Sequence, residues 1–327
     1  MKIFIIGDGG WGTATAILLS GYGHDVTVWG VDAAYVAEMA STRQNPRFLP
    51  GVTLPDNVKW TASPADAAGA EVVVLAVPSR YFADVCVRFR DYIPESALVV
   101  SLAKGFCDKT HKRMTELAAA ALGRGRIVAV SGPSHAEEVA RGIPTVVVAA
   151  AEDPEDARFV QTIWSGPRFR VYASDDPIGV EVGGAVKNVI AIAVGASDGL
   201  GFGDNTRAAL ITRGIAEVAR FAHALGAKPQ TVFGLSGMGD LVVTCTSRHS
   251  RNRLVGERLG KGEKIDDIIS SMQMVAEGVW NADVVCSMAR EHGVEMPISD
   301  LVRRLCHEGF PAADAIGLLM NRPMKDE

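Results

Sequence analysis

The sequence predicts an N-terminal α/β domain built on a doubly wound sheet, over residues 1–175, and an all-helical domain over residues 176–327. In the first half, short β-rich runs alternate with helical patterns, which is typical of a sheet covered by helices. Several of these runs are continuously apolar, as expected for strands of a buried parallel sheet. After Asp175 the patterns are helical, and a length of 327 residues suits two domains.

The individual elements follow from the spacing of apolar residues. Seven short runs are expected to form strands: Lys2–Ile6, Asp25–Trp29, Glu71–Val77, Ala97–Leu102, Arg126–Val130, Thr145–Ala149 and Phe169–Tyr172. Five patterns between them are expected to form crossover helices: Trp11–Gly21, Ala33–Ser41, Tyr81–Asp91, Lys109–Leu122 and Pro154–Trp164. The helices expected in the second half are Ile178–Ser197, Asn205–Leu225, Arg251–Leu259, Ala282–Glu291 and Ile298–Cys306. The domain boundary is placed in the polar run 173–176, which ends at a proline.

Composition and charge exclude several classes of protein. With 33 Lys and Arg against 38 Asp and Glu, the net charge is −5, which argues against binding to nucleic acid or an anionic membrane. A hydrophobic content of 48% argues against disorder. Five cysteines without a CxxC spacing indicate neither a disulfide framework nor a metal site. The apolar stretches are shorter than the ~18 residues of a membrane span, and the N-terminal one is too short for a signal peptide, so we expect a cytoplasmic protein.

A glycine-rich loop directly follows the first predicted strand. Gly7, Gly9 and Gly12 have the G-x-G-x-x-G spacing, and a helix is predicted to begin within the motif. In a Rossmann-type domain these glycines allow a tight turn, close approach of a pyrophosphate, and close packing of helix on strand. The alternative is a glycine-rich turn without a ligand, but the strand–turn–helix context favours dinucleotide binding.

The sequence leaves the choice between NAD and NADP open. An acidic residue at the end of the second strand would bind the ribose 2′-hydroxyl of NAD, but no acid lies directly at Trp29 or Gly30. Asp32 lies 20 residues after Gly12, which is about the expected distance, although it could equally cap the helix that follows. No arginine for a 2′-phosphate is evident at this position either.

Two further strand ends carry polar groups. Ser134 and Glu137 have the spacing of a helix capping box, which needs no ligand. The same segment would also point backbone N–H groups into the space above the sheet. Lys104 adds a cation at another strand end, on the side where open α/β sheets bind ligands. Both segments are therefore candidate ligand sites.

Lys187 follows two glycines within a predicted helix. Because helical side chains lean towards the N-terminus, Lys187 is expected to lie over the turn that contains Gly183 and Gly184. Paired glycines cost a helix about 1 kcal/mol each, so something is expected to approach closely there. An apolar setting would lower the pKa of Lys187 and allow proton exchange near neutral pH. The alternative is a structural lysine paired with a carboxylate such as Glu181, beside glycines that serve helix packing.

A local excess of positive charge surrounds the start of another predicted helix. Residues 245–261 contain five Lys and Arg and one Glu, an excess of +4. A helix that begins at Ser250 or Arg251 would combine its N-terminal dipole with arginine side chains, which suits a phosphate. The alternative is a solvated basic helix face.

Taken together, several blocks resemble the bacterial type of NAD(P)-dependent glycerol-3-phosphate dehydrogenase. They are Gly7–Ala14, Ser131–Glu137, Gly183–Ile190, Asp198–Asn205, Gly237–Cys245, Ser250–Arg253 and Glu277–Gly278. Their order along nearly the whole chain makes the resemblance far more specific than a single glycine motif. It implies hydride transfer between a nicotinamide ring and C2 of dihydroxyacetone phosphate, giving sn-glycerol 3-phosphate for glycerophospholipid synthesis, or the reverse.

The resemblance implies that Lys187 is the catalytic residue, which exchanges a proton with the oxygen on C2. Asp240 would orient Lys187 or hold a substrate hydroxyl, and Arg251 and Asn252 would bind the substrate phosphate. The implied substrate contacts are Lys104, Gly132, Ser134, Lys187, Asp240, Thr244, Ser250, Arg251 and Asn252. The cofactor contacts expected from the glycine loop and the resemblance together are Gly7, Gly9, Gly10, Trp11, Gly12, Lys104, Ala136, Arg251, Val275 and Glu277.

One position departs from the family pattern. Val31 stands where many relatives carry Arg or His beside the adenosine, so a 2′-phosphate contact is missing or is supplied elsewhere. The resemblance also implies a homodimer. Two alternatives are another two-domain dehydrogenase, of the 3-hydroxyacid or 6-phosphogluconate type, and a non-catalytic NAD(H)-binding redox sensor.

Overall fold

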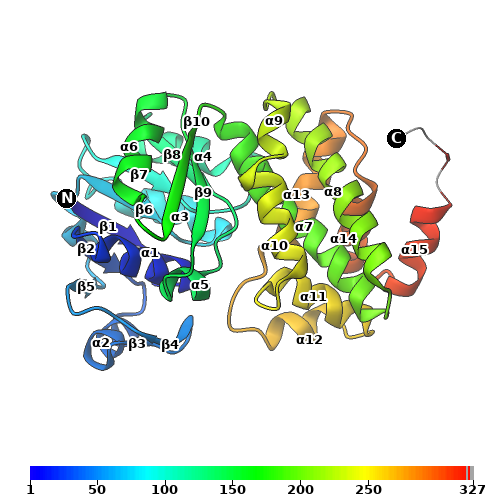
Figure 1. Cartoon of the computed structure of the whole chain (residues 1–327), viewed down its shortest axis with the longest axis horizontal. Coiled ribbons are helices and arrows are strands. Elements are labelled where there is room, and N and C mark those ends of the chain that lie inside the picture. Colours follow the sequence, from blue (N-terminus) through cyan, green and yellow to red (C-terminus); the bar gives the residue numbers. More distant parts are fainter. Residues whose placement is uncertain (322, 325–327) are drawn as a thin grey trace. The chain divides into compact units, whose positions relative to one another are not determined.

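The computed structural model describes residues 1–321, 323 and 324 (Figure 1). The chain forms two compact units, of which the first spans Met1–Glu181 and the second begins at Val182. The change of unit falls inside one long helix, α7 (Pro177–Gly199), whose first residue is the proline that ends the polar run.

The first unit is built on an eight-stranded sheet. Its strands are β1 (Lys2–Ile6), β2 (Asp25–Trp29), β5 (Val58–Thr61), β6 (Val72–Leu75), β7 (Leu98–Ser101), β8 (Ile127–Ser131), β9 (Thr145–Ala150) and β10 (Phe169–Ser174). They lie in the order β10-β9-β8-β7-β6-β1-β2-β5. Neighbours run parallel except β8 and β9, which are antiparallel. A separate two-stranded sheet pairs β3 (Gln44–Asn45) with β4 (Leu49–Thr53).

The central strands β1, β6, β7 and β8 are buried on both faces, as their apolar sequences predict. In β1, Ile3 and Ile5 belong to one buried cluster, while Phe4 and Ile6 belong to another on the opposite face. The helices that cover the sheet are α1 (Gly10–Gly21), α2 (Ala33–Thr42), α3 (Ser79–Phe89), α4 (Met114–Leu122), α5 (Ala136–Ala140) and α6 (Pro154–Trp164), with a short 3-10 helix at Pro64–Ala67. The predicted doubly wound α/β architecture is confirmed.

In the described part of the second unit the secondary structure is helical, as predicted. Its elements are α8 (Asp204–Ala224), α9 (Pro229–Val232), a π-helical turn (Leu235–Gly239), α10 (Asp240–Thr246), α11 (Arg251–Gly260), α12 (Ile265–Ser270), α13 (Glu277–Glu291), α14 (Pro297–His307) and α15 (Ala312–Met320). Buried residues of α11, α12, α13, α14 and α15 form one hydrophobic cluster with Val189, Ile192 and Ala196 of α7. Within the described residues, α7 is the one helix long and apolar enough to cross a membrane, and 89% of that stretch is buried, so it is a core helix.

Glycines let two helices of this unit approach closely. A Cβ atom at Gly195 or Gly199 of α7 would overlap the backbone of α11, and one at Gly256 or Gly260 of α11 would overlap the backbone of α7. The packing fixes the start of α11 relative to the segment of α7 that carries Lys187. These four glycines are therefore required by helix packing.

Candidate active site

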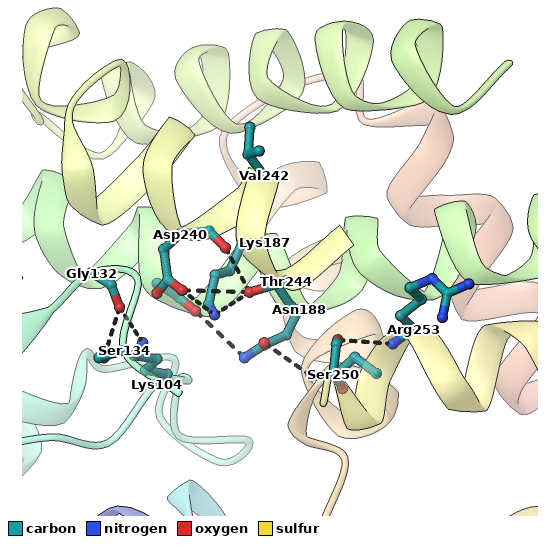
Figure 2. A network of polar contacts seen from close by, with 12 residues as sticks. Lys104, Gly132, Ser134, Lys187, Asn188, Asp240, Val242, Thr244, Ser250 and Arg253 are labelled. Atoms are coloured by element: carbon teal, nitrogen blue, oxygen red, sulfur yellow. Dashed lines mark hydrogen bonds and ion pairs between the residues drawn. The ribbon is translucent and has the colours of Figure 1, made fainter. Parts of the chain in front are cut away.

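Lys187 lies at the centre of a buried polar cluster in the helical unit. Its Nζ donates hydrogen bonds to Asp240 Oδ1 and to Thr244 Oγ1, each at 2.7 Å (Figure 2). Lys187 is 6% exposed and Asp240 is 2% exposed. The Thr244 hydroxyl in turn donates to the carbonyl oxygen of Asp240 at 2.6 Å, so its oxygen is oriented to accept from the ammonium. The arrangement fixes the ammonium in position.

The structure identifies the carboxylate that pairs with Lys187. Glu181 is not its partner, because that carboxylate accepts from Arg113 at 2.6 Å and from the amide and hydroxyl of Thr115 at 2.8 and 2.6 Å. The expectation of a lysine paired with a carboxylate is met by Asp240, and only the choice of Glu181 was wrong. Gly183 does serve packing, because a Cβ there would lie 2.9 Å from the carbonyl oxygen of Ser236. The group that closely approaches Gly183 is therefore protein backbone and not a ligand.

In the first unit, three predicted site residues form one polar cluster. Lys104 Nζ donates to the carbonyl oxygen of Gly132 at 3.3 Å, and Ser134 Oγ donates to the same oxygen at 2.9 Å (Figure 2). Gly132 has a φ of +142°, and a Cβ there would lie 3.0 Å from the Cα of Val147. A side chain at this position would therefore strain the turn, which explains the glycine.

The capping box predicted for Ser134 and Glu137 was wrong. Helix α5 begins at Ala136 with His135 as its N-cap residue, and no side-chain cap bond is made. The hydroxyl of Ser134 is directed instead towards Gly132. A capping box would need Ser134 as the N-cap residue. Because α5 begins one residue later than that, Ser134 and Glu137 do not occupy the N-cap and N3 positions.

The glycine loop lies between β1 and α1, as predicted, and its geometry fits a dinucleotide. Gly7 has a φ of +122°, and a Cβ at Gly12 would overlap the carbonyl oxygen of Gly7. Gly9 differs, because its φ is −65° and a Cβ there would meet no described atom within 4 Å. Neither strain nor packing requires a glycine at this position, whereas a pyrophosphate close to the backbone would. The open space beside Gly9 suits such a ligand.

Helix α11 begins at Arg251 with Ser250 as its N-cap, as predicted. Ser250 Oγ accepts from the backbone N–H of Arg253 at 3.2 Å. The side chain of Arg251 is exposed and donates to the carbonyl oxygen of Val275 at 2.8 Å. Arg253 is committed to Asp198, with contacts of 2.8 and 2.9 Å, so the positive charge at the helix start is smaller than the sequence indicated.

The remaining predicted residues occupy the starts of helices or the segments before them. Ala136 is the first residue of α5, Glu277 is the first residue of α13, and Trp11 lies in the first turn of α1. Asn252 is buried. Its Nδ2 donates to Asn188 Oδ1, and its Oδ1 accepts from the N–H of Gly278, both at 2.9 Å.

Two asparagines hold these segments without having been singled out from the sequence. Asn188, next to Lys187, links α7 to the start of α11 through Asn252. Asn45 is fully buried, and its Nδ2 donates at 2.8 Å to the carbonyl oxygen of Asp8 and to Thr13 Oγ1. The signal for Asn188 was its place in the lysine motif, whereas nothing near Asn45 in the sequence indicated its role.

Comparison with known proteins gives a family match over both units. Residues 2–157 match the family model of the N-terminus of NAD-dependent glycerol-3-phosphate dehydrogenase, and residues 176–317 match that of its C-terminus. Glycerol-3-phosphate dehydrogenase (NAD(P)+) of Chlorobium phaeobacteroides is 47% identical over 331 residues, covering 100% of this chain and 99% of the relative. The corresponding enzyme of Moorella thermoacetica is 45% identical, covering 100% and 97%.

A crystal structure supports the same assignment. That of glycerol-3-phosphate dehydrogenase from Coxiella burnetii is similar to this chain with a TM-score of 0.95 and 38% identity, and the match covers 98% of this chain and 99% of the other. This match also supports the assignment of a Rossmann-like α/β sheet followed by a helical domain. The chain belongs to the NAD(P)-dependent glycerol-3-phosphate dehydrogenase family, and it is an oxidoreductase.

Proposed function

We propose that this chain catalyses the reversible NAD(P)H-dependent reduction of dihydroxyacetone phosphate to sn-glycerol 3-phosphate, and so supplies glycerophospholipid synthesis. The observation that carries the proposal is the buried ammonium of Lys187, held at 2.7 Å by both Asp240 and Thr244. Reduction of a ketone needs a hydride at carbon and a proton at oxygen. In a member of this family, a fixed ammonium suits the second requirement.

Lys187 is the proton donor in this proposal. When bound, the reduced nicotinamide supplies the hydride to C2 of the substrate. Lys187 Nζ gives one proton to the oxygen on C2, so that the C=O group becomes a CH–OH group, and in the oxidative direction Nζ takes the proton back. Asp240 and Thr244 act as positioning residues, because they fix Nζ and stabilise its charge.

The glycine loop is proposed to hold the dinucleotide. Gly9 offers the open approach for the pyrophosphate, and the N-terminal turn of α1 presents backbone N–H groups to it. The resemblance adds contacts from other segments to this assignment. The proposed cofactor contacts are Gly7, Gly9, Gly10, Trp11, Gly12, Lys104, Ala136, Arg251, Val275 and Glu277.

The substrate phosphate is assigned to the start of α11. The guanidinium of Arg251 is exposed and brings a positive charge to the start of α11, and the helix dipole favours an anion at this end. Ser250 and Asn252 belong to the same segment and hold its backbone in place. Lys104, Gly132 and Ser134 are assigned to the substrate as well, because they form one cluster around a carbonyl oxygen.

Initial rates of NADH and NADPH oxidation with dihydroxyacetone phosphate test the proposal. Turnover that depends on this substrate is expected. Activity on a 3-oxo acid without activity on dihydroxyacetone phosphate would favour a dehydrogenase of the 3-hydroxyacid type. Binding of NADH without turnover of any substrate would favour the redox sensor.

A cytoplasmic location and a homodimer are also proposed, on the resemblance. Sedimentation equilibrium of the full chain is expected to give twice the monomer mass. A mass equal to that of one chain at all concentrations of protein would contradict the dimer. Cell fractionation is expected to recover the activity with the cytoplasm.

A further inference from the structure

The end of β2 is where many NAD-dependent enzymes carry the acid that binds the ribose hydroxyls of the adenosine. Here that position is Gly30, and the next residue is Val31, which is 71% exposed and has no polar group. Asp32 follows, but it is committed to helix α2. Its Oδ1 accepts from the N–H of Tyr35 at 3.1 Å, and this hydrogen bond lowers the pKa of Asp32. The backbone after β2 therefore brings no carboxylate of its own to the ribose.

The carboxylate of Asp8, the residue between Gly7 and Gly9 of the glycine loop, lies beside Gly30. A Cβ built on Gly30 would lie 2.5 Å from Asp8 Oδ2 and 2.8 Å from Asp8 Cγ. The carboxylate, together with Val36 Cγ2 at 2.6 Å, thus occupies the space that a side chain at position 30 would fill. The acid that is missing at the end of β2 is supplied from the end of β1, which is the neighbouring strand.

The backbone around Asp8 is fixed. Its carbonyl oxygen accepts from Asn45 Nδ2 at 2.8 Å and from Thr13 Oγ1 at 3.1 Å. Asn45 is fully buried and also accepts from the Tyr35 hydroxyl at 2.7 Å. Because these contacts hold the loop between β1 and α1, the carboxylate of Asp8 is kept at the end of β2.

The charges near this carboxylate are unbalanced. Among the described residues Asp8 forms no ion pair, and burial raises the pKa of its carboxyl, with the charge of Asp32 adding to the rise and that of Arg47 opposing it. Arg47 lies 3.5 Å from Asp32 Oδ2 and stacks 4.1 Å above the ring of Tyr35. Two carboxylates therefore face one guanidinium, so this corner suits hydroxyl donors and disfavours a further phosphate.

We propose that Asp8 is the residue that makes the enzyme prefer NAD(H) over NADP(H), by accepting hydrogen bonds from the adenosine ribose and repelling a 2′-phosphate. The inference rests on the proposed dinucleotide site and concerns its specificity. Asp8 is a specificity-determining residue and has no part in proton transfer. Val31 contributes by offering no donor to a phosphate.

The test compares NADH with NADPH in the full chain, using kcat/KM with dihydroxyacetone phosphate and dissociation constants from nicotinamide fluorescence. The wild type is expected to favour NADH. In Asp8→Ala, loss of a hydrogen bond to a charged group lowers kcat/KM for NADH about tenfold to hundredfold. The value for NADPH stays or rises, so the NADH/NADPH ratio falls at least tenfold, while kcat at saturating NADH is unchanged.

Two further variants serve as controls. Asp8→Asn keeps the shape of the side chain and should also lower the NADH/NADPH ratio, so it replaces Asp8→Ala as the test if Asp8→Ala folds poorly. Asp25→Ala, at the opposite end of β2, is expected to leave the ratio unchanged. A wild type that favours NADPH or shows no preference would overturn the proposal, as would an unchanged ratio in both Asp8 variants. Absence of turnover would refute only the proposed reaction, because the binding ratio still tests Asp8.

Discussion

Each unit of the molecule contains an ion pair between two buried residues, and these two pairs differ in what they can do. In the first unit Arg113 contacts Glu181 at 2.6 Å, and Thr115 donates two further hydrogen bonds to the same carboxylate. In the second unit Lys187 contacts Asp240 at 2.7 Å. All four charged residues are buried, with at most 9% of each residue exposed, so burial alone does not distinguish the pairs.

The difference lies in the cation. A guanidinium stays protonated under all ordinary conditions and binds carboxylates through a rigid fork, which suits a permanent link between α4 and α7. An ammonium is a compact charge that can lose a proton, which suits chemistry. We therefore expect Arg113 to govern stability and Lys187 to govern turnover. Variants of the two pairs test this division.

Replacement of Lys187 by alanine is expected to lower kcat by about 10³-fold or more, because the proton donor is lost. Binding of NADH should remain within a few-fold of the wild type. Stopped assays over long times measure the residual rate, and fluorescence titration measures binding. Lys264→Ala, which removes an exposed lysine before α12, is the control and should leave both values unchanged.

Replacement of Arg113 by alanine is expected to lower the free energy of unfolding by about 3–5 kcal/mol, because it leaves the Glu181 carboxylate buried without its cation. Urea denaturation measures the change. Arg158→Ala breaks an exposed pair with Glu155 on α6 and should cost less than about 1 kcal/mol. Equal costs for the two variants would contradict a structural role for the buried pair.

Glu217 is a third buried carboxylate, and it accepts from Ile298 N at 2.7 Å and from the amide and hydroxyl of Ser299. Burial raises its pKa from 4.5 to about 7, although these hydrogen bonds act to lower the pKa. A raised acid pKa means that the folded state binds more protons, so its stabilising contribution is complete below pH ~4.5 and falls as pH rises towards 7.

Comparison of the wild type with Glu217→Gln isolates this contribution. Between pH 5 and pH 8 the stability of the wild type relative to the variant should fall by about 2–3 kcal/mol, from the size of the pKa shift. Urea denaturation at both pH values gives the difference. A relative stability that does not change with pH, or that rises, would contradict the assignment.

Replacement of Asp240 by asparagine is expected to lower kcat about tenfold to hundredfold, because the ammonium of Lys187 loses its counter-charge but keeps a polar neighbour. The alkaline limb of the pH–kcat profile should move to lower pH, since a neutral partner no longer favours the charged ammonium. Thr244→Val should have a smaller effect. An unmoved pH profile would mean that Asp240 has only a structural role.

Much of the fold could be predicted from local patterns. The strands β1 and β2 have the predicted bounds, because β1 ends in an apolar run before the glycine loop and β2 is rich in β-branched and aromatic residues. Strands β3, β4 and β5 were missed, since residues 44–61 are short segments broken by Pro50 and Pro55 and do not alternate clearly. The antiparallel pairing of β8 and β9 could not be predicted either, because an apolar sequence does not indicate in which direction a strand runs relative to its neighbour.

Candidate site residues could be proposed from the sequence, but their pairings could not. Lys187 stood out because of the glycines before it, and the start of α11 because of Ser250. The contact between Lys187 and Asp240 joins residues 53 positions apart, a separation at which no helical or strand spacing applies. For the same reason the position of Asp8 beside Gly30 could not be predicted.

Chemical rescue of Lys187→Ala examines whether the Lys187 ammonium is the proton donor. If Lys187 is the proton donor, added primary alkylamines should raise kcat of the variant in proportion to their concentration, with no effect on the wild type or on Arg113→Ala. The rate should also rise with the fraction of amine that is protonated, when dihydroxyacetone phosphate is reduced. A Lys187→Ala enzyme that turns over within tenfold of the wild type, without amine, would contradict the account.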